Sequence, residues 1–385
     1  MSELKFNTKA IHGKTSKKDA HNALKYPIYA GVAYGFDSAE DLEAAFAGKK
    51  PAHAYSRITN PTVEAFENKI TALEDGLATV AVSSGMAAIA NVLINLVQAG
   101  DNIVSARALF GGTYSLLEKT LTPLGVETRF VDIDELNQVA KAIDAKTRIL
   151  FFETISNPKM NVPDIAALAA LAKKNNIVTV VDSTVTSPYL FKAKEHGVNI
   201  VVHSTTKFIS GGATGVGGVI VDLGTFDWTK FASLAEYHRL KEWAFIARLR
   251  KEVYRDLGAC LSPQNAYQQS LGLETLSLRV ERSCENTLKL AEFLSRQKAV
   301  LKVNYPGLKT SPYYALAKIQ FKQAGAIVTF ELKDKAACFR FLNKLALIKR
   351  ATNLGDNTTL VIHPASTIFI EYSAEERAAM GVTEG

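Results

Sequence analysis

Two ionisable side chains that follow apolar strands could together support covalent chemistry. Asp182 closes the apolar run I-V-T-V-V-D, and Lys207 follows the apolar run N-I-V-V-H-S. The carboxyl ends of parallel strands meet at one edge of a sheet, which places both side chains at that edge. A strand-end lysine is usually solvated and a strand-end aspartate usually caps a turn, so neither residue alone indicates a site. Together they offer an amine that can attack a carbonyl group and a carboxylate that can hold a proton.

A short motif, S-S-G-M at residues 83–86, could bind an anion. It lies where an apolar strand turns into the helical pattern 86–97, and the N-terminus of a helix offers free N–H groups and a favourable dipole. Taken alone, a capped helix start explains the motif better. Ser204 and Thr206 lie two residues apart, so in an extended segment both hydroxyl groups face the same way. Two hydroxyls and a helix N-terminus suit one phosphate dianion.

The combination of these groups at one sheet edge matches what pyridoxal phosphate needs. That cofactor requires an imine-forming lysine, a carboxylate at its pyridine nitrogen and a phosphate cup. A charge pair at about 4 Å, with an effective dielectric constant near 20, is worth about 4 kcal/mol. Such a pair would raise the pKa of the pyridine nitrogen by roughly three. The sequence therefore predicts a pyridoxal-phosphate site with Lys207 as the amine and Asp182 as the carboxylate.

Two other phosphate-binding motifs are excluded by the residues at key positions. Gly13-Lys14-Thr15 resembles the end of a P-loop, but Thr8 stands where that motif needs a glycine. The run G-G-A-T-G-V-G-G at 211–218 precedes a strand, and Ile220 stands where a dinucleotide fingerprint needs its third glycine. We therefore expect neither a P-loop nor a dinucleotide site.

Alternating strand and helix patterns must position these residues. They predict an α/β fold with a doubly wound, mostly parallel sheet of seven strands and helices on both faces. The clearest helical patterns are Met86–Val97 and Pro163–Lys174. The predicted strands are residues 79–82, 103–105, 127–131, 148–152, 177–181, 200–203 and 216–221.

Patterning divides the chain into three parts. Residues 1–60 have few periodic runs and are expected to form an extended arm. Residues 61–257 are expected to form the large cofactor-binding domain, which ends in a long helical stretch, Phe231–Leu257. Residues 258–385 predict a smaller α+β domain. Its expected elements are helices at 279–296 and 335–345 and strands at 300–304 and 326–332.

Composition argues against several functional classes. The 385 residues carry a formal charge of +7, but lysines and arginines are scattered and no nucleic-acid-binding motif occurs, so we expect no nucleic-acid partner. The longest apolar stretch, Thr79–Val97, is interrupted by Ser83-Ser84-Gly85, so we expect no membrane span. Cys260, Cys284 and Cys338 are widely spaced without a C-x-x-C pair, which indicates a reducing cytoplasm and no structural metal.

The ordered motifs of the chain resemble the Cys/Met metabolism family of fold-type I pyridoxal-phosphate enzymes. The resemblance runs from near Asn7 to the last residue. The motifs that carry it are Y-S-R-I-T-N-P-T (55–62), S-S-G-M-A-A-I (83–89), L-F-G-G-T (109–113), E-T-I-S-N-P (153–158), V-D-S-T-V-T-S-P (181–188), H-S-T-T-K (203–207) and H-P-A-S-T (363–367).

The resemblance implies roles for individual residues. Lys207 would hold the cofactor covalently and move protons, and Asp182 would pair with the ring nitrogen. Phe110 would stack on the ring, and Asn157 would lie near its phenolic oxygen. The residues that would hold the phosphate are Gly85, Met86, Ser204 and Thr206.

The resemblance also implies a shared active site. Tyr55 and Arg57 would reach the cofactor phosphate of a neighbouring subunit, which makes the protein a dimer at least. Because members of the family are usually tetramers, we expect a homotetramer built from two dimers. Tyr55 is accordingly expected to take part in catalysis.

Several departures from the family pattern bear on the activity. Phe110 replaces a tyrosine that many members carry, which keeps the stacking but loses a hydroxyl group. Gly112 stands where methionine γ-lyases typically have a cysteine, which disfavours a lyase. The stretch A-T-N-L-G-D-N-T-T-L-V-I-H-P-A-S (351–366) is similar to the O-acetylhomoserine sulfhydrylase branch. Within it, Asn353 would lie beside the carboxylate of the substrate.

These features predict γ-replacement in methionine biosynthesis, in which O-acetyl-L-homoserine and sulfide give L-homocysteine and acetate. The sulfur donor could instead be a small protein thiocarboxylate. The alternative activities are a methionine or cystathionine γ-lyase and a cystathionine γ-synthase. Members of the family continue past T-E-G with R-L-S-V-G, whose arginine binds the substrate carboxylate, whereas this sequence stops at Gly385. We therefore expect an incomplete sequence, with a cofactor-binding but inactive truncated form as a further alternative.

Overall fold

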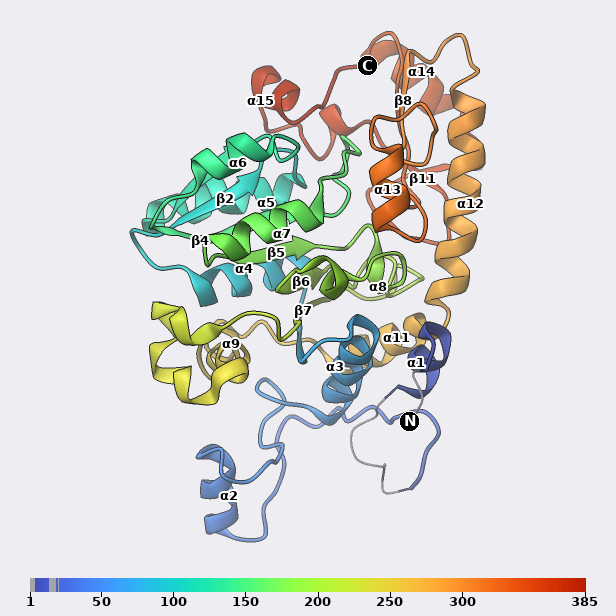
Figure 1. Ribbon diagram of the computed structural model, residues 1–385. Coiled ribbons are helices and arrows are strands. Elements are labelled where there is room, and N and C mark those ends of the chain that lie inside the picture. Colours follow the sequence, from blue (N-terminus) through green and yellow to red (C-terminus); the bar gives the residue numbers. More distant parts are fainter. Residues whose placement is uncertain (1–3, 14–18, 20) are drawn as a thin grey trace.

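A seven-stranded sheet forms the centre of the computed structural model, which describes residues 4–13, 19 and 21–385 (Figure 1). Lys14 and Thr15 of the excluded P-loop lie outside the described residues. The strand order is β1-β7-β6-β5-β4-β2-β3. The strands are β1 (Ala78–Val82), β2 (Asn102–Ala106), β3 (Glu127–Val131), β4 (Thr147–Glu153), β5 (Val178–Asp182), β6 (Ile200–His203) and β7 (Gly218–Asp222).

The predicted mostly parallel sheet is confirmed. Strand β7 runs antiparallel to both of its neighbours, β1 and β6, and the other neighbouring pairs are parallel. Runs such as V-T-V-V in β5 are buried, as expected for strands covered on both faces. The register pairs Glu153 of β4 with Asp182 of β5. Two carboxyl groups therefore stand side by side at the carboxyl edge of the sheet.

Helices pack in two layers, one on each face of the sheet. Helices α3 (Pro61–Glu74), α6 (Leu136–Ala142), α7 (Ile165–Lys174) and α8 (Ser187–Leu190) belong to one layer. The other layer contains α4 (Gly85–Leu96), α5 (Gly111–Ser115) and much of the helical run from 232 to 257. The predicted helices 86–97 and 163–174 correspond to α4 and α7, with boundary shifts of one or two residues.

The predicted helical stretch Phe231–Leu257 is helical from Ala232 onward, but it is not one continuous α-helix. Residues Ala232–Trp243 form a 3₁₀ segment, which is followed by α9 (Ala244–Arg248), a π turn (Leu249–Val253) and α10 (Tyr254–Leu257). The first segment buries only Leu234, and Lys241 adopts non-helical dihedral angles, φ 51° and ψ −121°. Because helices in proteins are stabilised mainly by packing an apolar face, a segment with so little burial does not maintain an α-helix.

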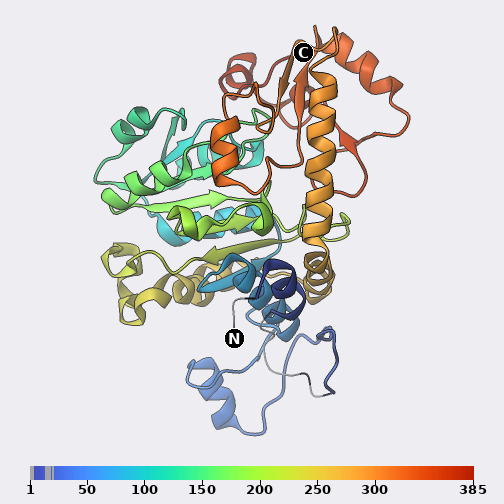
Figure 2. The same cartoon turned by 45° about the vertical axis from the view of Figure 1, so that its right-hand side comes forward.

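The N-terminal part contains two helices that the expectation of an extended arm missed. Helix α1 (Phe6–His12) packs on α3. Helix α2 (Ala39–Phe46) begins where the Ser38 side chain accepts a hydrogen bond from the Asp41 amide, and it buries no residue. In Figures 1 and 2, α2 extends beyond the sheet on the side opposite the C-terminal elements. Segments of this part remain irregular, with an isolated bridge between Ala33 and Tyr55.

The C-terminal part has the mixed α and β composition that the sequence predicts. Helix α12 (Leu276–Leu294) runs along one side of the molecule (Figure 2). The other elements are α11 (Pro263–Glu274), β8 (Lys302–Asn304), α13 (Tyr314–Gln320), β9 (Thr329–Glu331), α14 (Lys335–Lys344), β10 (Lys349–Arg350), β11 (Leu360–Val361) and α15 (Ala374–Ala379). Strand β8 pairs antiparallel with β9, and β10 pairs in parallel with β11.

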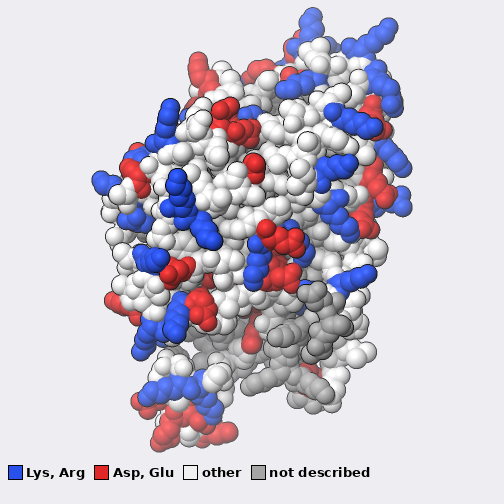
Figure 3. All heavy atoms as spheres, in the orientation of Figure 1, with Lys and Arg blue, Asp and Glu red and all other residues white. Residues whose placement is uncertain are grey.

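Charged side chains of both signs are mixed on the surface. On the face shown in Figure 3, basic and acidic side chains are interspersed. Within the described part of the chain, none of the helices combines the length and the apolarity needed to cross a bilayer.

Candidate active site

A cavity of about 420 Å³ lies at the carboxyl ends of β4, β5 and β6. It contains most of the residues that the sequence predicts for the site. The predicted residues that line it are Gly85, Met86, Phe110, Asn157, Asp182, Ser204, Thr206, Lys207 and Asn353. Its remaining walls include the aliphatic side chains of Ile89, Ile155, Val185, Val216, Leu354, Ile362 and Ile368.

Lys207 brings a primary amine into this cavity. It lies four residues beyond His203, the last residue of β6, in a turn closed by its own amide donating to Ser204 O at 3.2 Å. The Nζ atom donates a hydrogen bond to Asn353 Oδ1 at 2.9 Å. Burial lowers the pKa of Lys207 from its ordinary value, because a poorly hydrated site disfavours the charged ammonium. The lowered pKa enlarges the neutral fraction of the amine, which is the nucleophilic form.

Asp182 places a carboxylate at the same edge. Its Oδ1 accepts a hydrogen bond from the Thr184 amide at 2.9 Å. Burial is the largest influence and raises the pKa of Asp182, whereas hydrogen bonds from Thr184 and the charge of His203 act in the opposite direction. Thr184 Oγ1 also accepts a bond from the Ser204 amide at 2.8 Å. Thr184, which was not among the predicted site residues, therefore connects the ends of β5 and β6.

The start of α4 has the groups expected of an anion cradle. The Ser84 side chain caps the helix by accepting a bond from the Ala87 amide at 3.0 Å. The amides of Gly85 and Met86 belong to the first turn, where helix geometry supplies no intrahelical acceptor. A Cβ atom added to Gly85 would lie 2.5 Å from the Ser204 Cβ atom. Only glycine therefore allows the helix start and the Ser204 segment to approach so closely.

Thr206 is less available than predicted. Its Oγ1 donates to Gly217 O at 3.1 Å and accepts from the Gly217 amide at 3.0 Å. The hydroxyl proton is thus directed to the backbone of the glycine run. Thr206 could still contact an anion, but it would have to redirect this proton. Ser204 and the helix amides form the more direct part of the cradle.

Phe110 and Asn157 border the cavity, and both are bonded to one buried carboxyl group. Glu153 Oε1 accepts from the Phe110 amide at 2.6 Å, and Oε2 accepts from the Asn157 amide at 3.3 Å. The Phe110 ring is 41% exposed. Glu153 also lines the cavity, although it was not among the predicted site residues. The sequence did contain a signal for Glu153, because this residue is the first of the family motif E-T-I-S-N-P.

Tyr55 and Arg57 are not brought to the cavity of their own chain. Tyr55 is 39% exposed, and the Arg57 guanidinium lies 5.5 Å from the centre of its ring. Arg57 Nη1 donates to Arg255 O at 2.6 Å. Neither residue lines the cavity, so any role in it requires a second subunit.

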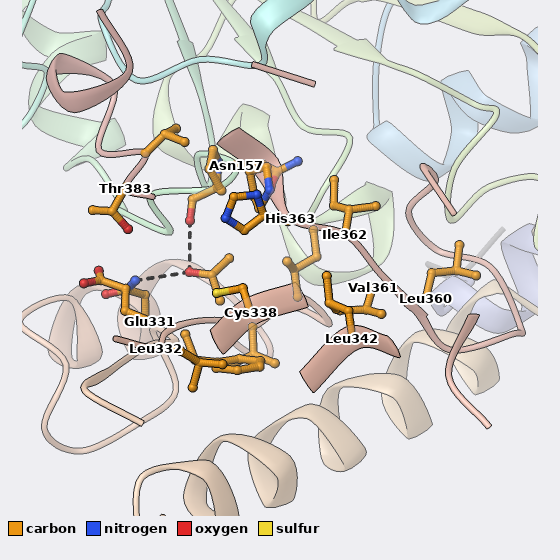
Figure 4. Close-up of a pocket in the computed structure, with 18 of the residues that line it drawn as sticks. Asn157, Glu331, Leu332, Cys338, Leu342, Leu360, Val361, Ile362, His363 and Thr383 are labelled. Atoms are coloured by element: carbon orange, nitrogen blue, oxygen red, sulfur yellow. Dashed lines mark hydrogen bonds between the residues drawn. The ribbon is translucent and has the colours of Figure 1, made fainter. Parts of the chain in front are cut away.

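A second cavity of about 210 Å³ lies beside the first (Figure 4). Both cavities share four lining residues: Asn157, Asn353, Leu354 and Ile362. At its rim, Thr329 Oγ1 donates to Pro158 O at 3.1 Å and accepts from Asn304 Nδ2 at 3.2 Å. The lining is mostly apolar and contains no lysine or arginine among the described residues. The first cavity is the one that holds a lysine amine together with carboxyl groups, Lys207 with Asp182 and Glu153.

The residues of the first cavity fit the pyridoxal phosphate that the sequence predicts. An amine with a lowered pKa, a half-buried carboxylate and a glycine-dependent anion cradle open into one space. These are the three features that this cofactor requires. Among residues 4–13, 19 and 21–385, no group of three or more His, Cys, Asp or Glu side chains could hold a metal ion.

Comparison with known proteins gives a consistent result. Residues 7–385 match the family model described as Cys/Met metabolism PLP-dependent enzyme. The chain is 40% identical to an O-acetyl-L-homoserine sulfhydrylase of Leptospira meyeri, covering 99% of this chain and 92% of that protein. It is 39% identical to an L-methionine gamma-lyase of Fusobacterium nucleatum, covering 100% of this chain and 93% of that one.

A solved structure resembles the whole chain. It is a putative O-acetylhomoserine (thiol)-lyase from Campylobacter jejuni, with a TM-score of 0.95 and 35% sequence identity. The match covers 99% of this chain and 94% of the other. That structure contains N'-pyridoxyl-lysine-5'-monophosphate.

Proposed function

Because the chain belongs to the Cys/Met metabolism PLP-dependent enzyme family, we propose that it converts O-acetyl-L-homoserine and sulfide into L-homocysteine and acetate. The C–O bond at Cγ of the substrate breaks and a C–S bond forms there, so no oxidant or reductant is consumed. The observation that carries the proposal is the cavity that Lys207 and Asp182 share. The identity of 40% to a sulfhydrylase over nearly the whole chain gives the substrate class.

The residues of the cavity support a specific placement of pyridoxal phosphate. Lys207 would attach it, Asp182 would face its ring nitrogen, and Phe110 and Asn157 would border the ring. The phosphate would be held by Gly85, Met86, Ser204 and Thr206. When bound, this cofactor supplies an electron-withdrawing ring that stabilises negative charge on the carbon skeleton of an amino acid.

Lys207 and Asp182 have complementary tasks with protons. The Lys207 amine, once free, acts as the base that takes the Cα proton of the substrate and later one from Cβ. Burial lowers the pKa of Lys207, so a larger fraction of the amine is neutral at neutral pH and can accept a proton. For the same reason, the protonated amine gives its proton back more readily than a solvated lysine would. Asp182, when negatively charged, would favour a proton at the ring nitrogen of the bound cofactor. A cationic partner offsets the burial that otherwise raises the pKa of Asp182.

Two features favour replacement over a lyase reaction. Aliphatic side chains form much of the cavity wall, which limits the access of water to reacting groups. A Cβ atom added to Gly112 would lie 2.8 Å from Phe110 Cε1 and 3.3 Å from Met86 Sδ. A cysteine at this position, typical of methionine γ-lyases, would therefore displace the Phe110 ring.

We further propose a homotetramer of two dimers with shared active sites. The N-terminal segment presents exposed apolar side chains, including Val32 (57% exposed) and Phe46 (69% exposed). Burial of such side chains against a second subunit would stabilise an interface. In that arrangement Tyr55 and Arg57 would contribute to the neighbouring cavity. Tyr55 would lie beside the reacting groups, and Arg57 would face the cofactor phosphate.

The sulfur donor and the compartment are further parts of the proposal. Free sulfide is the simplest donor, and a protein thiocarboxylate is the second candidate. A cytoplasmic location agrees with three cysteines, Cys260, Cys284 and Cys338, that are all unpaired.

A product assay tests the activity. Purified protein with pyridoxal phosphate is incubated with O-acetyl-L-homoserine and one of three sulfur compounds: sulfide, cysteine or a protein thiocarboxylate. A separate reaction contains L-methionine as the only substrate. Homocysteine formed with sulfide supports the proposal. Cystathionine formed with cysteine would indicate a cystathionine γ-synthase, and 2-oxobutyrate with ammonia from methionine would indicate a γ-lyase. Cofactor binding without any product would indicate an inactive form.

A further inference from the structure

Glu153 is a buried carboxyl group at the edge of the active site for which the proposed reaction has no assigned role. It is the last residue of β4, is 7% exposed and lines the larger cavity. Its two oxygen atoms accept bonds from two different segments, through the Phe110 amide at 2.6 Å and the Asn157 amide at 3.3 Å. Burying a carboxyl group is costly, so its retention here calls for a compensating interaction.

The two bonded amides belong to segments that reach the cavity from different parts of the chain. Phe110 precedes α5, and Asn157 lies in the loop between β4 and α7. The side chains of both residues line the cavity. The Glu153 carboxyl group is therefore a bridge between two walls of the same cavity. Hydrogen bonds from backbone amides to a carboxylate are strong and directional, which suits a group that fixes distances.

The ionisable groups around Glu153 include the proposed active-site residues Asp182 and Lys207. In the parallel register it stands beside Asp182. Burial is the main cause that raises the pKa of Glu153 to about 8, the charge of Asp182 adds to it, and the two amide bonds oppose it. On β6, His203 acts on Asp182 and has its Nε2 2.6 Å from Glu74 Oε1. Lys207 lines the same cavity.

We propose that Glu153 is a positioning residue that holds the Phe110 and Asn157 walls at the separation needed to clamp the cofactor ring. This inference rests on the proposed cofactor site and adds a residue that acts without touching the reacting atoms.

The test measures the affinity of the apoprotein for pyridoxal phosphate, by the change in visible absorption and in protein fluorescence on titration. Glu153→Gln keeps the size of the side chain, but its one carbonyl oxygen can accept from only one of the two amides. We expect this variant to bind pyridoxal phosphate roughly tenfold more weakly, as for the loss of one buried hydrogen bond. Glu153→Leu loses both acceptors and is expected to bind more weakly still.

The matched control is Asp222→Asn. Asp222 is also a fully buried strand-end carboxyl group that accepts an amide bond, from Gly224 at 2.8 Å, but it does not line the cavity. Asp222→Asn is expected to keep the wild-type affinity. In a Phe110→Ala background the effect of Glu153→Gln is expected to shrink, because one of the two walls that Glu153 positions then lacks its ring.

The outcomes separate this inference from the proposed function. If wild-type apoprotein does not bind pyridoxal phosphate, the cofactor site itself is wrong. If it binds, but Glu153→Gln has an affinity within twofold of wild type, only the role of Glu153 is wrong. An equal loss in Asp222→Asn, or an undiminished effect in the Phe110→Ala background, would show a general effect on folding and would also overturn the inference. If Glu153→Leu does not fold, the affinity of Glu153→Gln for pyridoxal phosphate alone tests the inference.

Discussion

The side-chain amine of Lys207 donates a hydrogen bond to Asn353 Oδ1 at 2.9 Å, across 146 residues of sequence. The contact joins the strand-end segment of the large sheet to a loop of the C-terminal part. Asn353 is a neutral acceptor, so it orients the amine without raising its pKa through charge. Burial can then lower the pKa of Lys207 and favour the neutral amine.

A charged acceptor at this position should reverse that effect. In Asn353→Asp, a carboxylate next to Nζ favours the ammonium form and raises the pKa of Lys207. A pKa that is higher by one lowers the neutral fraction at pH 7 about tenfold. We expect slower incorporation of pyridoxal phosphate into the apoprotein at pH 7 and a rate that approaches wild type at alkaline pH. Stopped-flow absorbance measures this profile, with Asn353→Ser as the neutral control. A profile identical to wild type would refute the argument.

Subunit mixing should reveal whether active sites are shared. Lys207→Ala and Arg57→Ala should each be nearly inactive as homo-oligomers. In a mixed dimer, one site combines the intact Lys207 of one subunit with the intact Arg57 of the other. Random mixing in equal amounts places half of the subunits in such dimers, so activity should recover to about a quarter of wild type. Activity after refolding the mixture measures this recovery, and its absence would contradict the shared-site proposal.

Asp222 should make stability depend on pH. Burial raises the pKa of Asp222 from 3.8 to about 7 in the folded protein. The folded state therefore binds this proton more tightly than the unfolded state. The resulting stabilisation of the folded state is fully present below pH 3.8 and is lost as pH rises through about 7. A pKa that differs by one between the folded and the unfolded protein changes the free energy of unfolding by about 1.4 kcal/mol.

The Asp222→Asn variant isolates this contribution. Its neutral amide does not titrate, so its Tm should fall less than that of wild type between pH 5 and pH 8. Thermal unfolding followed by circular dichroism measures both curves. Parallel curves for the two proteins would show that the Asp222 carboxyl group is not the source of the dependence.

The sheet and the core of the site could be predicted from sequence because their signals are local. Buried strands of a parallel sheet are continuous apolar runs, and each strand predicted for the large sheet has boundaries within two residues of an observed strand. Asp182 and Lys207 follow such runs directly, so the topology of the sheet brings them to one edge.

The remaining features depend on contacts that no local pattern encodes. Glu153 bonds to Phe110, 43 residues earlier, and Thr184 bonds to Ser204, 20 residues later. The break at Lys241 depends on how little of its segment is buried. Short helices such as α2 are capped locally but carry no long periodic stripe, so they were not predicted.

The central claim is that the Lys207 amine carries out the reaction. The most direct measurement is homocysteine formation from O-acetyl-L-homoserine and sulfide by Lys207→Ala in the presence of pyridoxal phosphate. Lys230→Ala, which changes an exposed lysine paired with Asp227, is the control. We predict that Lys207→Ala loses activity by more than roughly a thousandfold, since its general base is absent, while the control keeps wild-type activity. Sulfide-dependent homocysteine formation by Lys207→Ala at a rate near wild type would contradict the account.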